Sequence, residues 1–215
     1  FIMNMNFNLF TSTNLLFGTG MLNELGKQKL PGKKALLLIS NGKSTRENGT
    51  LNKVQKQLEE AGVEYTLCAN IHENPTKEVV MEAASTAKKN SCDFIVGLGG
   101  GAVLDCSIGV AAMATYRGDL WDYVAGGTGK AKPLISKPLP IVTIATTSGT
   151  GSEINCWGVI SNNEANEKIG FGGVPELNPV LSIVDPTLML TVPAKYTAYQ
   201  GFDALFHNTE VMISK

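Results

Sequence analysis

Short, strongly apolar segments alternate with longer amphipathic segments along most of this chain, and this alternation limits its possible folds more than any other feature. Residues 35–39 form a continuous apolar run, as expected of a strand that is buried on both faces. Residues 51–61 follow, with apolar side chains at helical spacing. The same reasoning predicts strands over 64–67, 94–96 and 140–144 and helices over 77–89 and 103–115. Such an alternation forms βαβ units, so we predict an α/β fold with a mainly parallel sheet covered by helices.

The pattern changes late in the chain, where we place a domain boundary between Asp185 and Pro193. Beyond it, a helical stretch runs to the end of the sequence, with an expected break near Gly201. We therefore predict an α/β domain over 1–185 and the beginning of an all-α domain over 186–215. Because a single helix cannot bury its apolar face alone, we expect the native protein to continue past this sequence.

Charge and composition argue against several classes of partner. The formal net charge is -1 and no run of like charges occurs, so we expect neither a nucleic-acid nor a membrane partner. The first residues carry no basic region and lead into no long apolar run, so we expect no signal peptide. The cysteines, Cys68, Cys92, Cys106 and Cys156, show no CxxC spacing. We interpret them as reduced packing residues of a cytoplasmic protein.

The glycine-rich run 97–105, Gly-Leu-Gly-Gly-Gly-Ala-Val-Leu-Asp, is the strongest local motif. A predicted strand leads into it and a predicted helix leads out, so its glycines let a ligand approach the backbone at a helix N-terminus. A pyrophosphate group suits this position, because free backbone N–H groups and the positive end of the helix dipole favour an anion. The alternative is a tight turn without a ligand; three consecutive glycines favour phosphate.

Two further polar loops follow predicted strands. Residues 146–153 carry hydroxyl groups that suit phosphate or ribose oxygens, although the loop alone could be polar surface. Together with the glycine run, this loop predicts two walls of one dinucleotide cleft. Residues 40–44 lack the carboxylate that would bind a ribose 2′-hydroxyl, and Lys43 and Ser44 would tolerate a 2′-phosphate. An ordinary basic turn explains residues 40–44 equally well.

Asp203 and His207 lie four residues apart in the predicted last helix and therefore share one face of it. A carboxylate and an imidazole suit a borderline divalent metal such as Fe or Zn. Taken alone, such a pair is more often a salt bridge on a helix surface. The spacing by itself leaves both interpretations open.

Taken together, these motifs resemble the signature of the iron-containing (group III, metal-dependent) alcohol dehydrogenases. The resemblance rests on the runs 97–105, 146–153 and 203–210, which occur in the family order, and on 73–76. The runs 118–124, 159–162 and 166–168 most resemble the butanol dehydrogenase branch. The resemblance covers nearly the whole chain.

The resemblance implies a dehydroquinate synthase-like NAD(P)-binding domain followed by an all-α metal-binding domain, and a homodimer. It implies that the cofactor is bound by Asn74, Gly99, Gly100, Gly101, Thr146, Thr147, Lys168 and Leu181. Asp203 and His207 match the first two metal ligands, with iron preferred to zinc, and the family takes two further histidine ligands from a second half. His72 matches no ligand position and is expected to lie on the surface. Many relatives have an acidic residue where this chain has Asn41-Gly42.

The implied reaction is reversible hydride transfer between a primary alcohol or aldehyde and the nicotinamide C4, with the metal as Lewis acid on the substrate oxygen. The small alcohol or aldehyde is the only expected partner besides cofactor and metal. No side chain of this chain is identified as an obligatory general base. Two alternatives stay open: a glycerol dehydrogenase-like enzyme that acts on a polyol, and a non-catalytic nucleotide-binding module.

Overall fold

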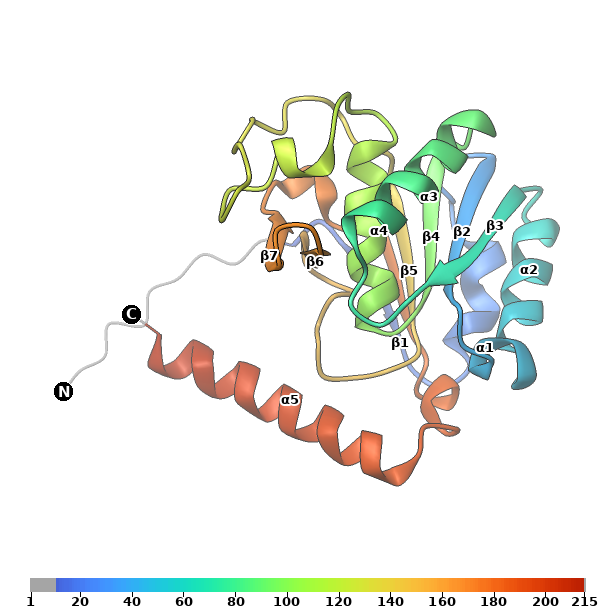
Figure 1. The fold of residues 1–215 in the computed structure, drawn as a ribbon. Helices are drawn as coiled ribbons and strands as arrows, with labels where there is room; N and C mark the ends of the chain where they lie inside the picture. Colours follow the sequence, from blue (N-terminus) through green and yellow to red (C-terminus); the bar gives the residue numbers. More distant parts are fainter. Residues whose placement is uncertain (1–10, 215) are drawn as a thin grey trace.

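The computed structural model describes residues 11–214, and a six-stranded sheet lies at its centre (Figure 1). Every pair of neighbouring strands in this sheet is parallel, in the order β1-β8-β5-β4-β2-β3. The strands are β1 (Asn14–Phe17), β2 (Lys34–Ser40), β3 (Glu64–Ile71), β4 (Phe94–Gly99), β5 (Ile141–Ala145) and β8 (Leu181–Val184). The predicted parallel α/β architecture is therefore confirmed.

Helices cover both faces of the sheet. On one face lie α3 (Lys77–Lys89) and α4 (Gly101–Met113), and on the other lies α2 (Thr50–Glu60). The remaining helices are α1 (Ser44–Glu47) and α5 (Ala194–Ile213), with the 3-10 turns η1 (Met21–Lys27), η2 (Leu120–Asp122), η3 (Pro175–Leu177) and η4 (Pro186–Met189). Leu36 and Leu38 of β2 pack in one core with residues of α3 and α4. Ala35, Leu37 and Ile39 pack in a second core with residues of η1 and α2. Successive side chains of a strand point to opposite faces, so the apolar run of β2 supplies both cores.

A two-stranded antiparallel hairpin, β6 (Trp157–Asn162) and β7 (Glu167–Gly172), packs beside α4 and was not predicted from the residue pattern. Its buried positions include Gly158 and Asn162, whereas Trp157 and Val159 are exposed. The usual strand signal, apolar residues inside and polar residues outside, is therefore inverted at several positions. Strand β1 was missed for a related reason, because none of its four side chains is fully buried.

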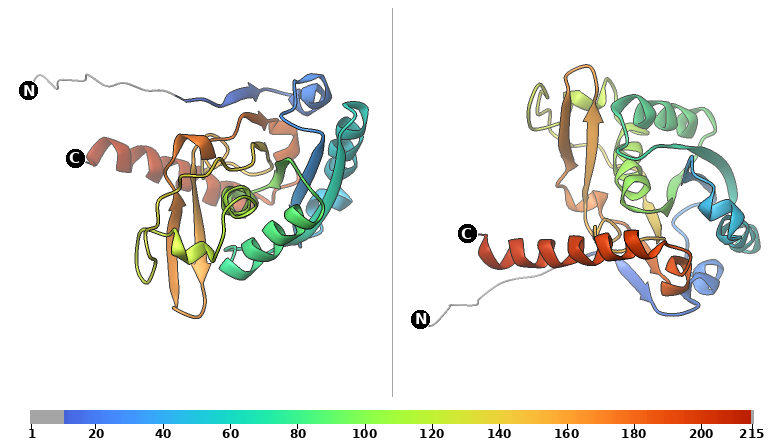
Figure 2. Two further views of the ribbon diagram at one scale, coloured as in Figure 1. Left: turned by 90° about the horizontal axis from the view of Figure 1, so that it is seen from above. Right: turned by 60° about the horizontal axis from the view of Figure 1, so that its bottom comes forward.

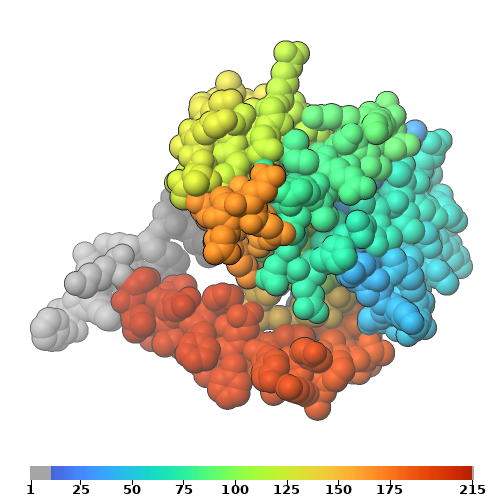
Figure 3. Space-filling model, in the orientation of Figure 1, coloured from blue at the N-terminus to red at the C-terminus, as the bar shows by residue number. Residues whose placement is uncertain are grey.

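Helix α5 is continuous through Gly201, so the expected break at this glycine is wrong. A single glycine inside a helix costs only about 1 kcal/mol relative to alanine, which does not end a helix without a second breaker. None of the residues of α5 is buried, and the helix runs beside the α/β body without joining either core (Figures 2 and 3). Within residues 11–214, no helix combines the length and apolar character needed to cross a membrane.

The strand order reverses direction between β2 and β4. The chain passes from β2 outward to β3 by way of α2, and returns to the other side of β2 by way of α3. The loops after β2 and β4 therefore leave the same edge of the sheet in opposite directions. A crevice forms at such a point, and ligands of open α/β sheets bind there.

Candidate functional site

The N-terminus of α4 lies between two hollows at the carboxyl ends of the strands. Gly101 and Ala102 belong to the walls of both, so the hollows meet at the first turn of this helix. The first, the switch-point pocket, has a volume of about 320 Å³. The second, the hairpin pocket, has a volume of about 530 Å³. A dinucleotide is long enough to need two such spaces joined at a phosphate-binding helix end.

The switch-point pocket is formed by the ends of three neighbouring strands and the loop after β5. Its walls are Ser40, Asn41, Gly42, Ile71, His72, Glu73, Gly100, Gly101, Ala102, Val103 and Thr147. The three loops that looked promising in the sequence thus contribute to one site, since 40–44, 97–105 and 146–153 each place residues in it. His72 is exposed, as expected, and it also lies in this wall.

The glycines at the start of α4 are required by close packing against the loop after β5. A Cβ atom at Gly100 would lie 2.8 Å from Oγ1 of Thr147, and one at Gly101 would lie 2.7 Å from Cγ2 of Thr150. Contacts this short do not occur with real side chains, so larger residues would displace the loop. The backbone of the loop is tied to the strand end, because the N–H of Thr146 donates to the carbonyl of Gly99 at 3.0 Å.

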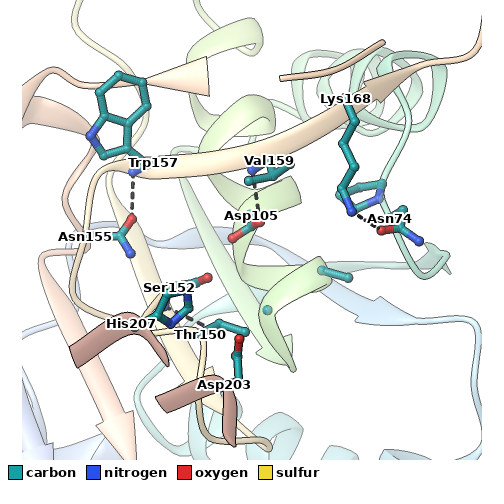
Figure 4. Close-up of a pocket in the computed structure, with 13 residues that line it drawn as sticks. Asn74, Asp105, Thr150, Ser152, Asn155, Trp157, Val159, Lys168, Asp203 and His207 are labelled. Atoms are coloured by element: carbon teal, nitrogen blue, oxygen red, sulfur yellow. Dashed lines mark hydrogen bonds between the residues drawn. The ribbon is translucent and has the colours of Figure 1, made fainter. Parts of the chain in front are cut away.

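The hairpin pocket lies between α4, the β6–β7 hairpin and α5 (Figure 4). Lys168 of β7 reaches across to the loop after β3, where its Nζ donates to Oδ1 of Asn74 at 2.6 Å. Trp157 and Val159 also line the pocket and are 53% and 40% exposed. The pocket therefore combines an exposed apolar wall with Lys168 and Asn74, which are two of the predicted cofactor residues.

Asp203 and His207 project from α5 toward the hairpin pocket and line it together (Figure 4). Nδ1 of His207 lies 3.0 Å from the carbonyl oxygen of Gly149. Because a carbonyl only accepts, Nδ1 carries the proton in this contact and Nε2 is left with a free lone pair. Metal-binding histidines are commonly oriented by such a bond, so the geometry suits a ligand.

The described part of the chain does not by itself form a complete metal centre. No group of three or more His, Cys, Asp or Glu side chains within it could hold a metal ion. Asp203 and His207 are thus two donors of matching chemistry that fit one side of a divalent metal site. The 146–151 loop holds α5 in place, because Oε1 of Gln200 accepts from both the N–H of Ser148, at 2.9 Å, and its hydroxyl, at 3.1 Å.

Asp105 is a pocket residue that sequence reasoning did not single out. It lies on α4, and its Oδ2 accepts from the backbone N–H of Val159 at 2.9 Å, which fixes the hairpin to the helix. Burial raises the pKa of the Asp105 carboxyl, and the N–H of Val159 and the hydroxyl of Ser152 partly oppose this effect. The residue ends the glycine-rich run, but nothing in its spacing distinguished it from an ordinary helix carboxylate.

The predicted cofactor residues fall into two groups in the structure. Asn74, Gly100, Thr147 and Lys168 each line one of the two pockets, and Gly101 lines both. Gly99, Thr146 and Leu181 do not appear in either wall. Gly99 and Thr146 lie directly behind the pockets at the strand ends, whereas Leu181 begins β8 and is 4% exposed in the core against α2 and η1.

Comparison with known proteins is consistent with this arrangement. The family model described as iron-containing alcohol dehydrogenase matches residues 12–186. The NADH-dependent butanol dehydrogenase B of Clostridium acetobutylicum is 33% identical over 94% of this chain and 50% of its own length. The 1,3-propanediol dehydrogenase of Klebsiella pneumoniae is 37% identical over 93% of this chain and 50% of its own length.

A solved structure shows the same fold. The NADH-dependent butanol dehydrogenase A of Thermotoga maritima superposes with a TM-score of 0.88 at 35% identity, over 95% of this chain and 50% of that one. The chain thus spans about half the length of the curated relatives it matches.

Proposed function

We propose that this chain, which belongs to the iron-containing alcohol dehydrogenase family, forms the cofactor-binding part of a metal-dependent, NAD(P)-linked alcohol dehydrogenase of the butanol dehydrogenase type. One observation carries the proposal. The N-terminus of α4 separates a pocket at the topological switch point from a pocket that contains Asp203 and His207. A dinucleotide that spans the helix end would have its two halves in these two spaces.

The direction of the cofactor follows from the chemistry of the two pockets. The pyrophosphate would accept hydrogen bonds from the backbone N–H groups at the start of α4, those of the N-cap residue Gly100 and of Gly101. The adenosine ribose would occupy the switch-point pocket beside Asn41 and Thr147. The nicotinamide would then lie in the hairpin pocket, where hydrophobic and polar groups are combined and the two metal-ligand candidates converge.

The chain's own residues prepare the reaction by binding and orientation. When bound, the nicotinamide accepts the hydride from the alcohol carbon, and the divalent metal polarises the alcohol oxygen. The carbonyl of Gly149 orients the imidazole of His207 so that Nε2 would be available to hold the metal, and Asp203 would supply an oxygen donor. The hairpin forms one wall of the pocket, and Asp105 holds it against α4.

The pocket wall supports a small apolar alcohol over a polyol as substrate. Trp157 and Val159 add exposed apolar surface to the pocket that the metal-ligand candidates also line, which suits an alkyl chain. The names of two of the relatives refer to NADH and butanol. We extend both features to the full-length protein as part of the proposal, together with a homodimeric, cytoplasmic enzyme.

The test is isotope transfer by the full-length protein loaded with iron or zinc. With 1,1-dideuterated butan-1-ol, the reduced NAD or NADP should gain one deuterium at the nicotinamide C4, seen by mass spectrometry. Asp203→Asn should remove this transfer but keep cofactor binding. Transfer from glycerol in preference to butanol would favour a polyol enzyme. Cofactor binding without transfer at any metal loading would leave only a nucleotide-binding protein. Light scattering of the same sample tests the homodimer.

A further inference from the structure

Asn41 and His72 form a polar contact in the wall of the switch-point pocket. They follow the neighbouring strands β2 and β3, and the backbone N–H of Asn41 donates to the carbonyl of Ile71 at 3.0 Å, which keeps the two strand ends together. Nδ2 of Asn41 lies 2.8 Å from Nδ1 of His72. Both side chains are exposed to the pocket, so each is accessible to a ligand.

The proton on the imidazole decides which atoms this pair presents. An amide nitrogen only donates, so Nδ1 of a neutral His72 accepts and the amide Oδ1 of Asn41 is free to accept from a ligand hydroxyl. When His72 is protonated, both ring nitrogens donate. The amide of Asn41 must then turn its oxygen toward the ring, and its NH₂ group becomes the one that faces a ligand.

The charges around the pair are few. Glu73 is the other ionisable side chain that the described residues place in the pocket wall. From the β2–α1 loop and α1, the guanidinium of Arg46 donates to the carbonyls of Ser40 and Gly42, and Lys43 and Glu47 are exposed nearby in the chain. From α4, the pocket receives the positive end of a helix dipole.

We propose that the Asn41–His72 pair determines which nicotinamide cofactor this site selects. When the imidazole is neutral, the pair accepts a hydrogen bond from a ribose 2′-hydroxyl. When the imidazole is charged, the pair donates hydrogen bonds to a 2′-phosphate. The inference rests on the proposed function, because it requires the adenosine ribose in the switch-point pocket. Histidine is the side chain that ordinarily changes charge between pH 5 and 8. The preference for NADP over NAD should therefore increase as the pH falls.

The experiment measures the Kd of NAD+ and of NADP+ for the full-length protein by calorimetry at pH 8.5 and pH 6.5. His72→Gln keeps a hydrogen-bonding side chain that carries no charge at either pH. The 2′-phosphate itself gains a proton near pH 6, but this affects wild type and variant alike. We expect the preference for NADP+ to rise by roughly tenfold more in the wild type than in His72→Gln, as for one charge-assisted hydrogen bond.

Two further variants separate the effect of charge in the pocket wall from the effect of the hydrogen-bonding groups of Asn41. Glu73→Gln removes a charge from the same wall without touching Asn41, so it should favour NADP+ at both pH values and leave the pH dependence unchanged. Asn41→Asp leaves only acceptor atoms, so it should weaken NADP+ at both pH values. An equal pH dependence in wild type and His72→Gln, with cofactor still bound, would overturn this inference alone. Failure of the wild type to bind either cofactor would overturn the proposed function instead.

Discussion

Nζ of Lys168 donates to Oδ1 of Asn74 at 2.6 Å, although 94 residues separate them in the chain. The contact joins the β6–β7 hairpin to the loop between β3 and α3. A second connection lies beside it, where the N–H of Ser161 donates to the carbonyl of Pro75 at 2.9 Å. Asn74 has a φ of 54°, a left-handed conformation that asparagine adopts more readily than most residues. The two cofactor candidates therefore form one unit in the wall of the hairpin pocket.

Because they form one unit, replacing either residue should have much the same effect. We expect Lys168→Met and Asn74→Ala each to weaken NAD(P)+ binding by about tenfold, the order expected for a hydrogen bond to a charged group. The double variant should lose clearly less than the product of the two single losses. Calorimetry on the four proteins measures this, with Lys56→Met, at an exposed position of α2, as the matched control. Independent, multiplicative losses would show that the two residues do not act together.

The sequence predicted those parts of the fold that rest on buried apolar runs and on helical spacing. Residues 35–39 are buried from both sides in β2, and α2 and α3 begin and end within two residues of the expected positions. The hairpin was not predictable in this way, because burial in it does not follow apolar character. Gly158 is buried because it is small, whereas the large apolar Trp157 is exposed. A Cβ atom at Gly158 would lie 2.5 Å from the backbone oxygen of Asp105, so only glycine permits this packing.

The candidate site was partly predictable for a similar reason. Glycines and hydroxyl residues that follow strands mark the carboxyl edge of a parallel sheet, so the loops at Gly100 and Thr147 could be placed together. Asp105 and His72 could not, because their roles depend on which distant backbone lies beside them. Leu181 entered the predicted site through the family resemblance alone, and its side chain is held in the core.

The close approach of Gly100 to Thr147 predicts that even a methyl group is not tolerated there. A Cβ atom would lie 2.8 Å from the threonine hydroxyl, so Gly100→Ala must displace the loop that forms the opposite wall. We expect the variant to fold but to bind NAD(P)+ at least about tenfold more weakly, since misplaced donors lose their hydrogen bonds to phosphate. Gly201→Ala is the control, because a Cβ atom there meets nothing within 4 Å. Unchanged affinity in Gly100→Ala would remove the pyrophosphate from this position.

Asp105 gives a pH dependence of stability with a defined sign. Burial raises the pKa of its carboxyl in the folded state above the value of 3.8 that it has when exposed. The folded protein therefore binds the proton more tightly than the unfolded chain, and stability falls as the pH rises from 3.8 through the raised pKa. Asp105→Asn should remove this fall and be at least as stable as the wild type at pH 7. Urea unfolding from pH 4 to pH 7 measures both curves, and identical slopes would contradict the assignment.

Asp122 should change the pH dependence of stability in the opposite direction to Asp105. Lys130 and Lys132 donate to its two oxygens at 2.7 and 2.9 Å, which lowers the pKa of Asp122 from 3.8 to about 2. Its contribution to stability is fully present above pH 3.8 and is lost as the pH falls toward 2. Asp122→Asn should therefore lower the Tm at pH 7, with the difference from wild type vanishing near pH 2. A difference in Tm that is the same at both pH values would mean that the ion pairs are not its cause.

Variants of the chain's two histidines test whether the metal-ligand candidates Asp203 and His207 bind the metal. His207 is oriented by the carbonyl of Gly149 beside Asp203, whereas His72 lies in the switch-point pocket. In the full-length protein we expect His207→Ala and Asp203→Asn to lose most of the metal, measured by elemental analysis after dialysis, and to keep NAD(P)+ binding. His72→Ala should keep the metal.

A catalytic metal site normally takes at least three protein ligands, and residues 11–214 bring only these two donors together. The 215-residue chain alone should consequently bind iron or zinc weakly and oxidise no alcohol. Stoichiometric metal that resists a chelator in this chain, and persists in His207→Ala, would show that other side chains form the site. Loss of metal in His72→Ala would instead place the ion in the switch-point pocket and reverse the direction in which the cofactor is bound.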